Sequence, residues 1–164
     1  MILYLVRHGI AVDRNDPKSP AEAERPLTAK GVQKTRSAAL GLKELGAKAD
    51  VFITSPYVRA AQTAEIFAEA LGYAPEKIRV SESLKPGADP ADILKEILQC
   101  KVKELACFGH APHLDLLLAH LAGAQGAFTE LKKAGVACLE HASAHGKWGL
   151  RWVLTPKMLR GLGD

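Results

Sequence analysis

The chain has 164 residues, of which 48% are hydrophobic and 24% charged, and its formal net charge is +4. This composition excludes a disordered chain, a coiled coil and a collagen, and it predicts a single packed domain over residues 1–164. The positive charge is too weak and scattered to predict nucleic-acid binding, although it favours phosphorylated or acidic substrates. No segment reaches the ~18 apolar residues of a membrane span, so we expect no membrane partner.

The chain has three cysteines, Cys100, Cys107 and Cys138, and none of them forms a CxxC pair. Because Cys107 lies within an apolar run, the pattern is more typical of reduced core thiols than of a catalytic thiol. The N-terminus has no basic segment ahead of a long apolar stretch, as a targeting signal would have. We therefore expect a cytoplasmic protein.

Short apolar runs alternate with helix signals along most of the chain, as in an α/β protein. Thr28 is suited to cap the first helix, and Gly46 and Gly72 to end the first and the second. The polar stretch at 11–26 contains three prolines and predicts a loop over a functional edge. The other expected elements are, in order, a strand at 2–6, a helix at 29–45, a strand at 51–53, a helix at 57–71, a strand at 78–80, a helix at 90–99, a strand at 105–108 and a helix at 113–123.

The C-terminal part predicts a hairpin. Strand-like runs at 136–140 and 148–154 flank the turn-rich segment SAHGK, which indicates two antiparallel strands at one edge of the sheet. The tail at 157–164 either docks or frays. The whole pattern predicts a three-layer α/β/α sandwich around a mostly parallel central sheet.

Polar residues follow the expected strands at the ends where ligand sites form in such sheets. Arg7 and His8 end the first strand, Arg59 lies one turn after the second, Glu82 follows the third, and His110 follows the fourth. The carboxyl ends of parallel strands meet at one edge. We therefore expect two histidines, two arginines and one carboxylate to converge there.

These side chains suit phosphoryl transfer. Each arginine presents a planar fork of donors that matches phosphate oxygens. A neutral imidazole at His8 can attack phosphorus and form a covalent phosphohistidine. The neighbouring cations lower the pKa of His8 and keep it neutral and nucleophilic. Gly9 leaves room where the backbone passes close to the site.

Each residue also has a structural interpretation. The Arg7-His8 pair alone fits a surface ion-pairing patch, His110 a core histidine and Glu82 a solvated loop carboxylate. His110 and His113 have the spacing of half a metal site, but no acidic or histidine partner follows at zinc-like spacing, so we expect no metal. The joint position of the five residues at strand ends favours catalysis over these alternatives.

Four motifs carry a family resemblance. The sequence resembles the histidine phosphatase superfamily, also called phosphoglycerate mutase-like, whose signature is an Arg-His-Gly after the first strand. The matching motifs here are LVRHG at 5–9, RPLTAKG at 25–31, TSPYVRAAQTA at 54–64 and GHAP at 109–112. The resemblance implies a phosphoglycerate mutase-like fold and a phosphatase that needs no cofactor.

The resemblance also implies a role for each matching residue. His8 is expected to accept the phosphoryl group, Arg7 and Arg59 to grip its oxygens, and His110 to add a further donor. Arg25 resembles an auxiliary cation of the same phosphate pocket. Glu82 falls where many members place the general acid that protonates the leaving oxygen, although the segment around it resembles the short-chain branch rather than the mutases.

The spacing between Glu82 and His110 distinguishes branches of the family. Only 27 residues lie between them, and a helix and a strand consume nearly all of these. The long insertion that roofs the site in the mutases is therefore missing. This architecture resembles the SixA-type phosphohistidine phosphatases, which implies a phosphorylated protein as substrate, such as a histidine-containing phosphotransfer domain.

Two other functions stay open from the sequence. A small-molecule phosphomonoesterase of the same fold would need Glu82 as an essential acid. A non-catalytic module that binds phosphorylated partners would not need the nucleophile, which the sequence retains. A mutase fits least, because return transfer to a small molecule requires an enclosed site.

Overall fold

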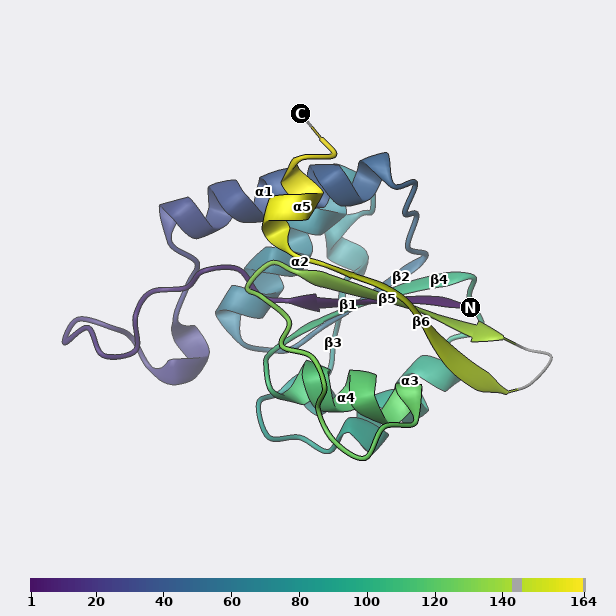
Figure 1. The fold of residues 1–164 in the computed structure, drawn as a ribbon. Helices are drawn as coiled ribbons and strands as arrows, with labels where there is room; N and C mark the ends of the chain where they lie inside the picture. The colour runs from purple at the N-terminus through teal and green to yellow at the C-terminus, as the bar shows by residue number, and fades with distance from the viewer. Residues whose placement is uncertain (143–145, 164) are drawn as a thin grey trace.

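The computed structural model describes residues 1–142 and 146–163 (Figure 1). Part of the turn expected at SAHGK, residues 143–145, therefore lies outside the described residues. The elements are β1 (Ile2–Arg7), α1 (Ala29–Glu44), β2 (Val51–Thr54), α2 (Val58–Leu71), β3 (Arg79–Val80), α3 (Pro90–Gln99), β4 (Glu104–Gly109), α4 (His113–Ala122), β5 (Val136–Ala142), β6 (Lys147–Leu154) and α5 (Pro156–Arg160).

The strands form one six-stranded sheet in the order β3-β2-β4-β1-β5-β6. Strands β3, β2, β4 and β1 run parallel, whereas β5 runs antiparallel to both of its neighbours. The prediction of a mostly parallel sheet with a hairpin at one edge is thus confirmed.

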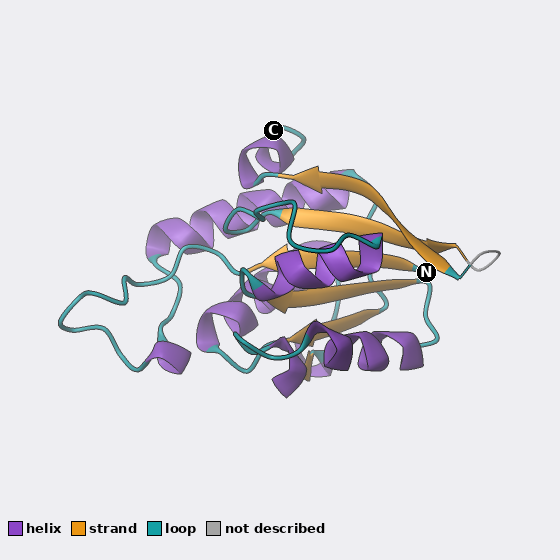
Figure 2. Cartoon of the chain, turned by 60° about the horizontal axis from the view of Figure 1, so that its bottom comes forward, coloured by secondary structure: helices purple, strands orange, loops and turns teal. Residues whose placement is uncertain are grey.

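Helices cover both faces of the sheet, as Figure 2 shows. On one face, α1, α2 and α5 pack a core that includes Leu42, Phe67 and Leu159. On the other face, α3 and α4 pack a separate core that includes Ile93 and Leu117. The three layers of the predicted sandwich are therefore present, and the strands between them are apolar toward both cores.

Local signals set most element boundaries as expected. The Thr28 hydroxyl accepts a hydrogen bond from the Gly31 amide at 3.0 Å and caps α1. Gly72 ends α2 with a left-handed φ of 72°. The helix expected over 57–71 begins one residue later, at Val58, because Tyr57 has the extended backbone of an N-cap.

The long loop and the C-terminal tail are more ordered than the sequence alone predicts. The loop expected at 11–26 contains a 3₁₀ turn at Glu22–Glu24 and is closed at its base by a bridge between Ala11 and Leu27. The tail docks, because α5 packs on α1 and buries Leu159 completely. No helix in the described part of the chain is both long and apolar enough to cross a membrane.

Candidate active site

A cavity of about 710 Å³ opens at the carboxyl ends of β1, β2 and β4. These strands are neighbours in the sheet, so the residues that follow them meet at one place. Five of the predicted site residues line the cavity, together with Glu22. The five are Arg7, His8, Arg25, Arg59 and His110.

Strand register brings the two histidines together. Arg7 of β1 pairs with Gly109 of β4, and the His8 amide donates to the Gly109 carbonyl at 2.9 Å. The residues that follow this pair therefore leave the sheet side by side. The centroids of the His8 and His110 rings are 5.1 Å apart, although 101 residues separate them in the chain.

The hydrogen bonds of His8 define its neutral form. Its Nδ1 lies 2.7 Å from the Gly9 carbonyl oxygen, which only accepts, so Nδ1 must carry the proton. Its Nε2 lies 3.3 Å from Arg59 Nε, which only donates, so Nε2 must offer its lone pair. Nε2 is therefore a nucleophile whose lone pair faces the cavity cations.

Burial and charge keep His8 neutral. The residue is 8% exposed, and burial is the main cause that lowers the pKa of His8 to about 4. The positive charges of Arg59, Arg7 and Lys133 lower it further, while the hydrogen bond to Gly9 opposes them. At neutral pH the imidazole is unprotonated, as nucleophilic attack requires.

Gly9 fits where a side chain would not. A Cβ at this position would collide with the Thr35 hydroxyl of α1. The Gly9 amide donates to Thr63 of α2 at 3.0 Å. The turn after His8 is therefore pressed between the two helices, which fixes the direction of the imidazole.

The two arginines beside His8 are held by different partners. Arg59 donates from Nη1 to the Glu22 carbonyl at 2.7 Å and from Nη2 to the Glu22 carboxylate at 2.9 Å. Arg7 donates from Nη1 to the Leu131 carbonyl at 2.5 Å. Arg7 Nε is buried without a partner among the described residues, so this donor is not used by the protein itself.

His110 is fixed by the segment after β2. Its Nε2 lies 2.9 Å from the Ser55 hydroxyl, and the Tyr57 ring packs edge-on against the imidazole. Its Nδ1 is buried with no partner among the described residues. Burial, followed by the neighbouring His8 and Arg59, holds the pKa of His110 far below its ordinary value.

Arg25 lines the cavity, but three of its five N–H donors are bound to other groups of the loop. Its Nε and Nη2 bind the two carboxylate oxygens of Glu22 at 2.8 and 2.7 Å, and Nη1 binds the Val12 carbonyl at 2.6 Å. This is a bidentate ion pair within the loop. As placed here, Arg25 supports Glu22 rather than a phosphate oxygen.

Glu82 is not brought to the cavity. Its side chain is 73% exposed, and its carboxylate forms an ion pair with Lys85. It begins a 3₁₀ turn (Glu82–Leu84) after the short β3 strand, and the cavity residue from this loop is Pro86. The expected convergence therefore holds for the two histidines and two arginines and does not include this carboxylate.

Sequence reasoning missed charged residues from two segments of the site. The polar loop before RPLT brings Asp13, Arg14 and Glu22 to the cavity, and their place in that loop was the only signal for them. The other is the segment before β5, which brings Lys133 to the cavity. Ala134 in this segment has a positive φ of 62°, and its amide donates to the carbonyls of Arg7 and His8 at 3.0 and 3.2 Å.

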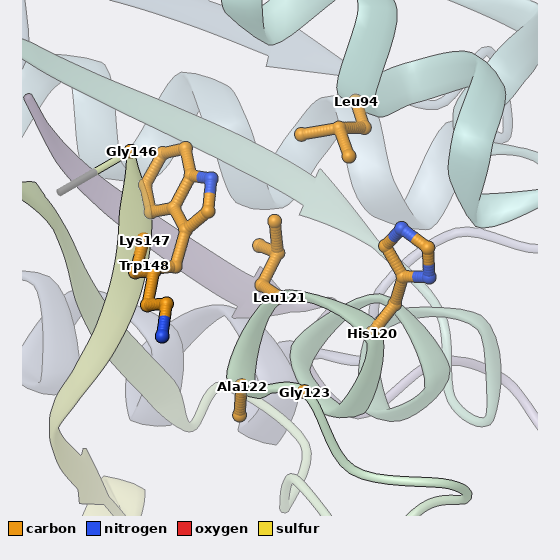
Figure 3. A pocket seen from close by; sticks show the side chains of 8 residues that line it. All are labelled: Leu94, His120, Leu121, Ala122, Gly123, Gly146, Lys147 and Trp148. Atoms are coloured by element: carbon orange, nitrogen blue, oxygen red, sulfur yellow. The ribbon is translucent and has the colours of Figure 1, made fainter.

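A second pocket of about 380 Å³ lies near the amino ends of the parallel strands. Figure 3 shows the Trp148 ring on one side and the His120 ring on the other, with Leu121 between them. None of the predicted site residues lines it. Across residues 1–142 and 146–163, no three potential metal ligands gather, and the His110 and His113 pair has no third member there.

The fold and the paired histidines and arginines define an α/β protein of the phosphatase class. A family model described as histidine phosphatase superfamily (branch 1) matches residues 3–85. The chain belongs to this superfamily, and the resemblance seen in its motifs is confirmed. It is an enzyme of the phosphatase type.

Relatives extend the match over nearly the whole chain. An uncharacterized protein of Picosynechococcus sp. is 38% identical over 149 residues, which cover 88% of this chain and 87% of the relative. The structure of the protein histidine phosphatase SixA with tungstate has a TM-score of 0.84 at 24% identity, and the match covers 96% of this chain and 98% of SixA. A phosphoserine phosphatase mutant from Entamoeba histolytica has a TM-score of 0.74 at 18% identity and covers the same shares.

These structural likenesses concern the fold. The match covers 98% of SixA, so neither chain carries a long insertion relative to the other. The predicted SixA-type architecture is therefore confirmed.

Proposed function

We propose that this chain removes phosphate from a phosphorylated histidine of another protein. The substrate imidazole first takes a proton from solvent on its other ring nitrogen. His8 Nε2 then attacks phosphorus, the bond from phosphorus to the substrate imidazole breaks, and that imidazole keeps the bonding electrons and leaves in its neutral form. Water then attacks the phosphohistidine at His8, which releases phosphate and returns the neutral imidazole. The neutral state of His8 supports this assignment.

The observation that carries the choice of substrate is the state of two carboxyls, Glu82 and Glu22. A third, Asp13, also lines the cavity, where its Oδ1 accepts from the Asn15 amide of its own loop at 2.9 Å. Glu82 is exposed and ion-paired to Lys85. Glu22 does line the cavity, but its hydrogen bond to Arg25 holds the pKa of its carboxyl below the ordinary range, so it is ionised at neutral pH. Neither carboxyl is suited to protonate a leaving group.

A phosphorylated imidazole has little need of such an acid. The conjugate acid of a leaving imidazole has a pKa of ~6.5, whereas an alkoxide leaves against a pKa of about 16. A phosphohistidine bond therefore breaks with weak protonation, while an alkyl phosphate requires a positioned acid. The site is accordingly better suited to phosphohistidine than to phosphoserine or sugar phosphates.

The remaining residues have complementary roles in this proposal. Arg7 and Arg59 bind the phosphoryl oxygens and stabilise the charge that develops on them. His110 adds a further donor in the tautomer that carries the proton on Nδ1, in which Nε2 accepts from the Ser55 hydroxyl while that hydroxyl accepts from the Tyr57 amide. No cofactor takes part in these steps.

The expected partner is a histidine-containing phosphotransfer domain, whose phosphohistidine stands on a convex surface and can enter an open cavity. We place the reaction in the cytoplasm. All three cysteines are free, and Cys107 and Cys138 are buried in the cores, which fits a reducing compartment.

A substrate comparison tests the proposal. We expect kcat/KM for a phosphorylated phosphotransfer domain to exceed that for phosphoserine and sugar phosphates by at least about a hundredfold. The unphosphorylated domain, added as a competitor, controls for docking. A higher kcat/KM for phosphoserine or sugar phosphates would instead identify a small-molecule phosphomonoesterase. The fold is compatible with that outcome, because the Entamoeba histolytica phosphoserine phosphatase has the same fold at a similar length.

A further inference from the structure

Glu22 is a carboxylate that lines the cavity and contacts Arg59, although no motif marked it. It lies in the 3₁₀ turn Glu22–Glu24 of the long loop, lines the cavity and contacts both Arg25 and Arg59. We propose that Glu22 is a positioning residue that orients Arg59 toward His8, with Arg25 as its support. This inference rests on the proposed role of Arg59 in binding the phosphoryl group.

Two atoms of Glu22 hold the guanidinium of Arg59. The carbonyl oxygen accepts from Nη1 at 2.7 Å, and carboxylate Oε1 accepts from Nη2 at 2.9 Å. Because the guanidinium is planar and rigid, fixing both terminal nitrogens also fixes the direction of Nε. Nε then points at His8 Nε2, at 3.3 Å.

This arrangement leaves the catalytic edge of Arg59 available. A guanidinium has five N–H donors, and only two of them are directed to Glu22. The Nε donor occupies the lone pair of His8 in the free enzyme. When a phosphoryl group approaches His8, the Nε donor can pass to a phosphoryl oxygen while Glu22 still accepts from Nη1 and Nη2. Glu22 thus orients Arg59 without competing for its reactive edge.

Arg25 explains why Glu22 stays in place although its side chain is 48% exposed. An exposed carboxylate normally samples several rotamers, and a single exposed ion pair orders it weakly. Here Arg25, itself 7% exposed, binds both carboxylate oxygens and is anchored to the Val12 carbonyl across the loop. The buried Arg25 therefore holds the Glu22 carboxylate in one conformation.

The charge of Glu22 gives the proposal a distinctive signature. Removal of the carboxylate leaves the positive charge of Arg59 uncompensated, so binding of an anion in the ground state does not weaken. The loss of orientation instead acts on the transition state, where a misplaced donor costs rate. We therefore expect kcat to fall without a rise in KM.

The experiment compares Glu22→Gln and Glu22→Ala with Glu24→Gln. Glu24 lies on the same 3₁₀ turn, and its side chain makes no hydrogen bond or ion pair with the described residues. With p-nitrophenyl phosphate, whose leaving group needs no proton, we expect kcat to fall about tenfold or more in Glu22→Ala and less in Glu22→Gln. The inhibition constant of inorganic phosphate stays equal or falls, and Tm changes little.

Other outcomes would overturn the assignment. If kcat of Glu22→Ala lies within about twofold of Glu24→Gln, Glu22 does not position Arg59. If phosphate inhibition weakens in step with a lowered Tm, Glu22 is merely structural. The isosteric Glu22→Gln variant keeps the loop folded and preserves the test if the alanine variant is unstable.

Arg25 provides an independent check. Arg25→Met should reduce kcat in the wild-type background. In the Glu22→Ala background it should cause little further loss of kcat, because both changes release the guanidinium of Arg59. Fully additive losses would show that Arg25 binds phosphate directly. If the wild type hydrolyses p-nitrophenyl phosphate but not a phosphorylated protein histidine, the proposed substrate fails while the assignment of Glu22 can still be tested.

Discussion

Arg7 and Arg59 flank the same imidazole, but the fold holds them in different ways. Arg7 is held by the backbone carbonyl of Leu131, in the segment that leads into the sheet. Arg59 is held by Glu22, on a loop that projects from the sandwich (Figure 1). A change on the Arg7 side should therefore disturb the fold, whereas a change on the Arg59 side should disturb mainly the chemistry.

The buried carboxylate of Asp115 shows how firmly the Arg7 side is attached. Its Oδ1 accepts from the Leu131 amide at 2.8 Å and from the Thr129 hydroxyl at 3.4 Å, and the residue is 3% exposed. Asp115 is on α4, so a helix, a loop and a strand end are linked in one chain of hydrogen bonds. Among the described residues, Glu22, in contrast, is linked within its loop and to Arg59.

The largest expected effect comes from removal of either arginine itself. Arg7→Ala and Arg59→Ala should each lower kcat/KM about 10²- to 10³-fold, because each loses a charged donor to the transferring group. Arg36→Ala, a change on an α1 residue outside the cavity lining, serves as the control. Steady-state kinetics on a phosphorylated phosphotransfer domain measures the loss. A kcat/KM within fivefold of wild type for either variant would contradict a direct role.

A change at Asp115 should distinguish the support of Arg7 from the support of Arg59. Asp115→Ala leaves the Leu131 amide unpaired in the core, so we expect the free energy of unfolding to fall by about 1–3 kcal/mol and kcat to fall about tenfold. Asp92→Ala, which removes an exposed carboxylate from α3, is the control. Urea unfolding and kinetics would measure both effects, and a loss of kcat with unchanged stability would remove the proposed difference between the arginines.

Acid should lower the stability of the protein, because the native fold keeps His8 neutral beside Arg7 and Arg59. Between pH 6.5 and about 4 the unfolded chain binds a proton that native His8 does not, so stability falls as the pH falls through this window. We expect Tm to be about 5 °C lower at pH 5 than at pH 7, with a smaller drop in His8→Gln. Calorimetry across this range would refute the expectation if the two proteins showed equal drops.

The smallest effect is expected at Glu82. Because its carboxylate is exposed and paired with Lys85 outside the cavity, Glu82→Gln should change kcat/KM for a phosphorylated histidine by less than about twofold. The same variant should be compared on phosphoserine. A loss of tenfold or more on either substrate would restore Glu82 as the general acid and move the site toward phosphomonoesters.

The sequence predicted the parts of the site that depend on strand order. Arg7, His8 and His110 follow β1 and β4, and backbone pairing alone brings such residues together. Arg59 follows the same logic one helical turn beyond β2. Signals of this kind are local, because apolar runs and capping residues fix each element and parallel pairing aligns their ends.

The contacts of Glu22 and Ala134 could not be predicted in this way. Both lie in irregular segments, where the conformation depends on a side chain or carbonyl from a distant part of the chain. Glu82 shows the converse. Its position after β3 was correct, but side-chain direction in a loop is not set by strand register, and the carboxylate faces solvent.

Trapping of the phosphoenzyme tests the central claim most directly. The enzyme is mixed with a phosphotransfer domain that carries labelled phosphate, quenched within one turnover and digested for mapping. We expect a label on His8 that survives base, is lost in acid and is absent from His8→Ala. A label that survives acid, or one that persists in His8→Ala, would contradict a covalent intermediate on this imidazole.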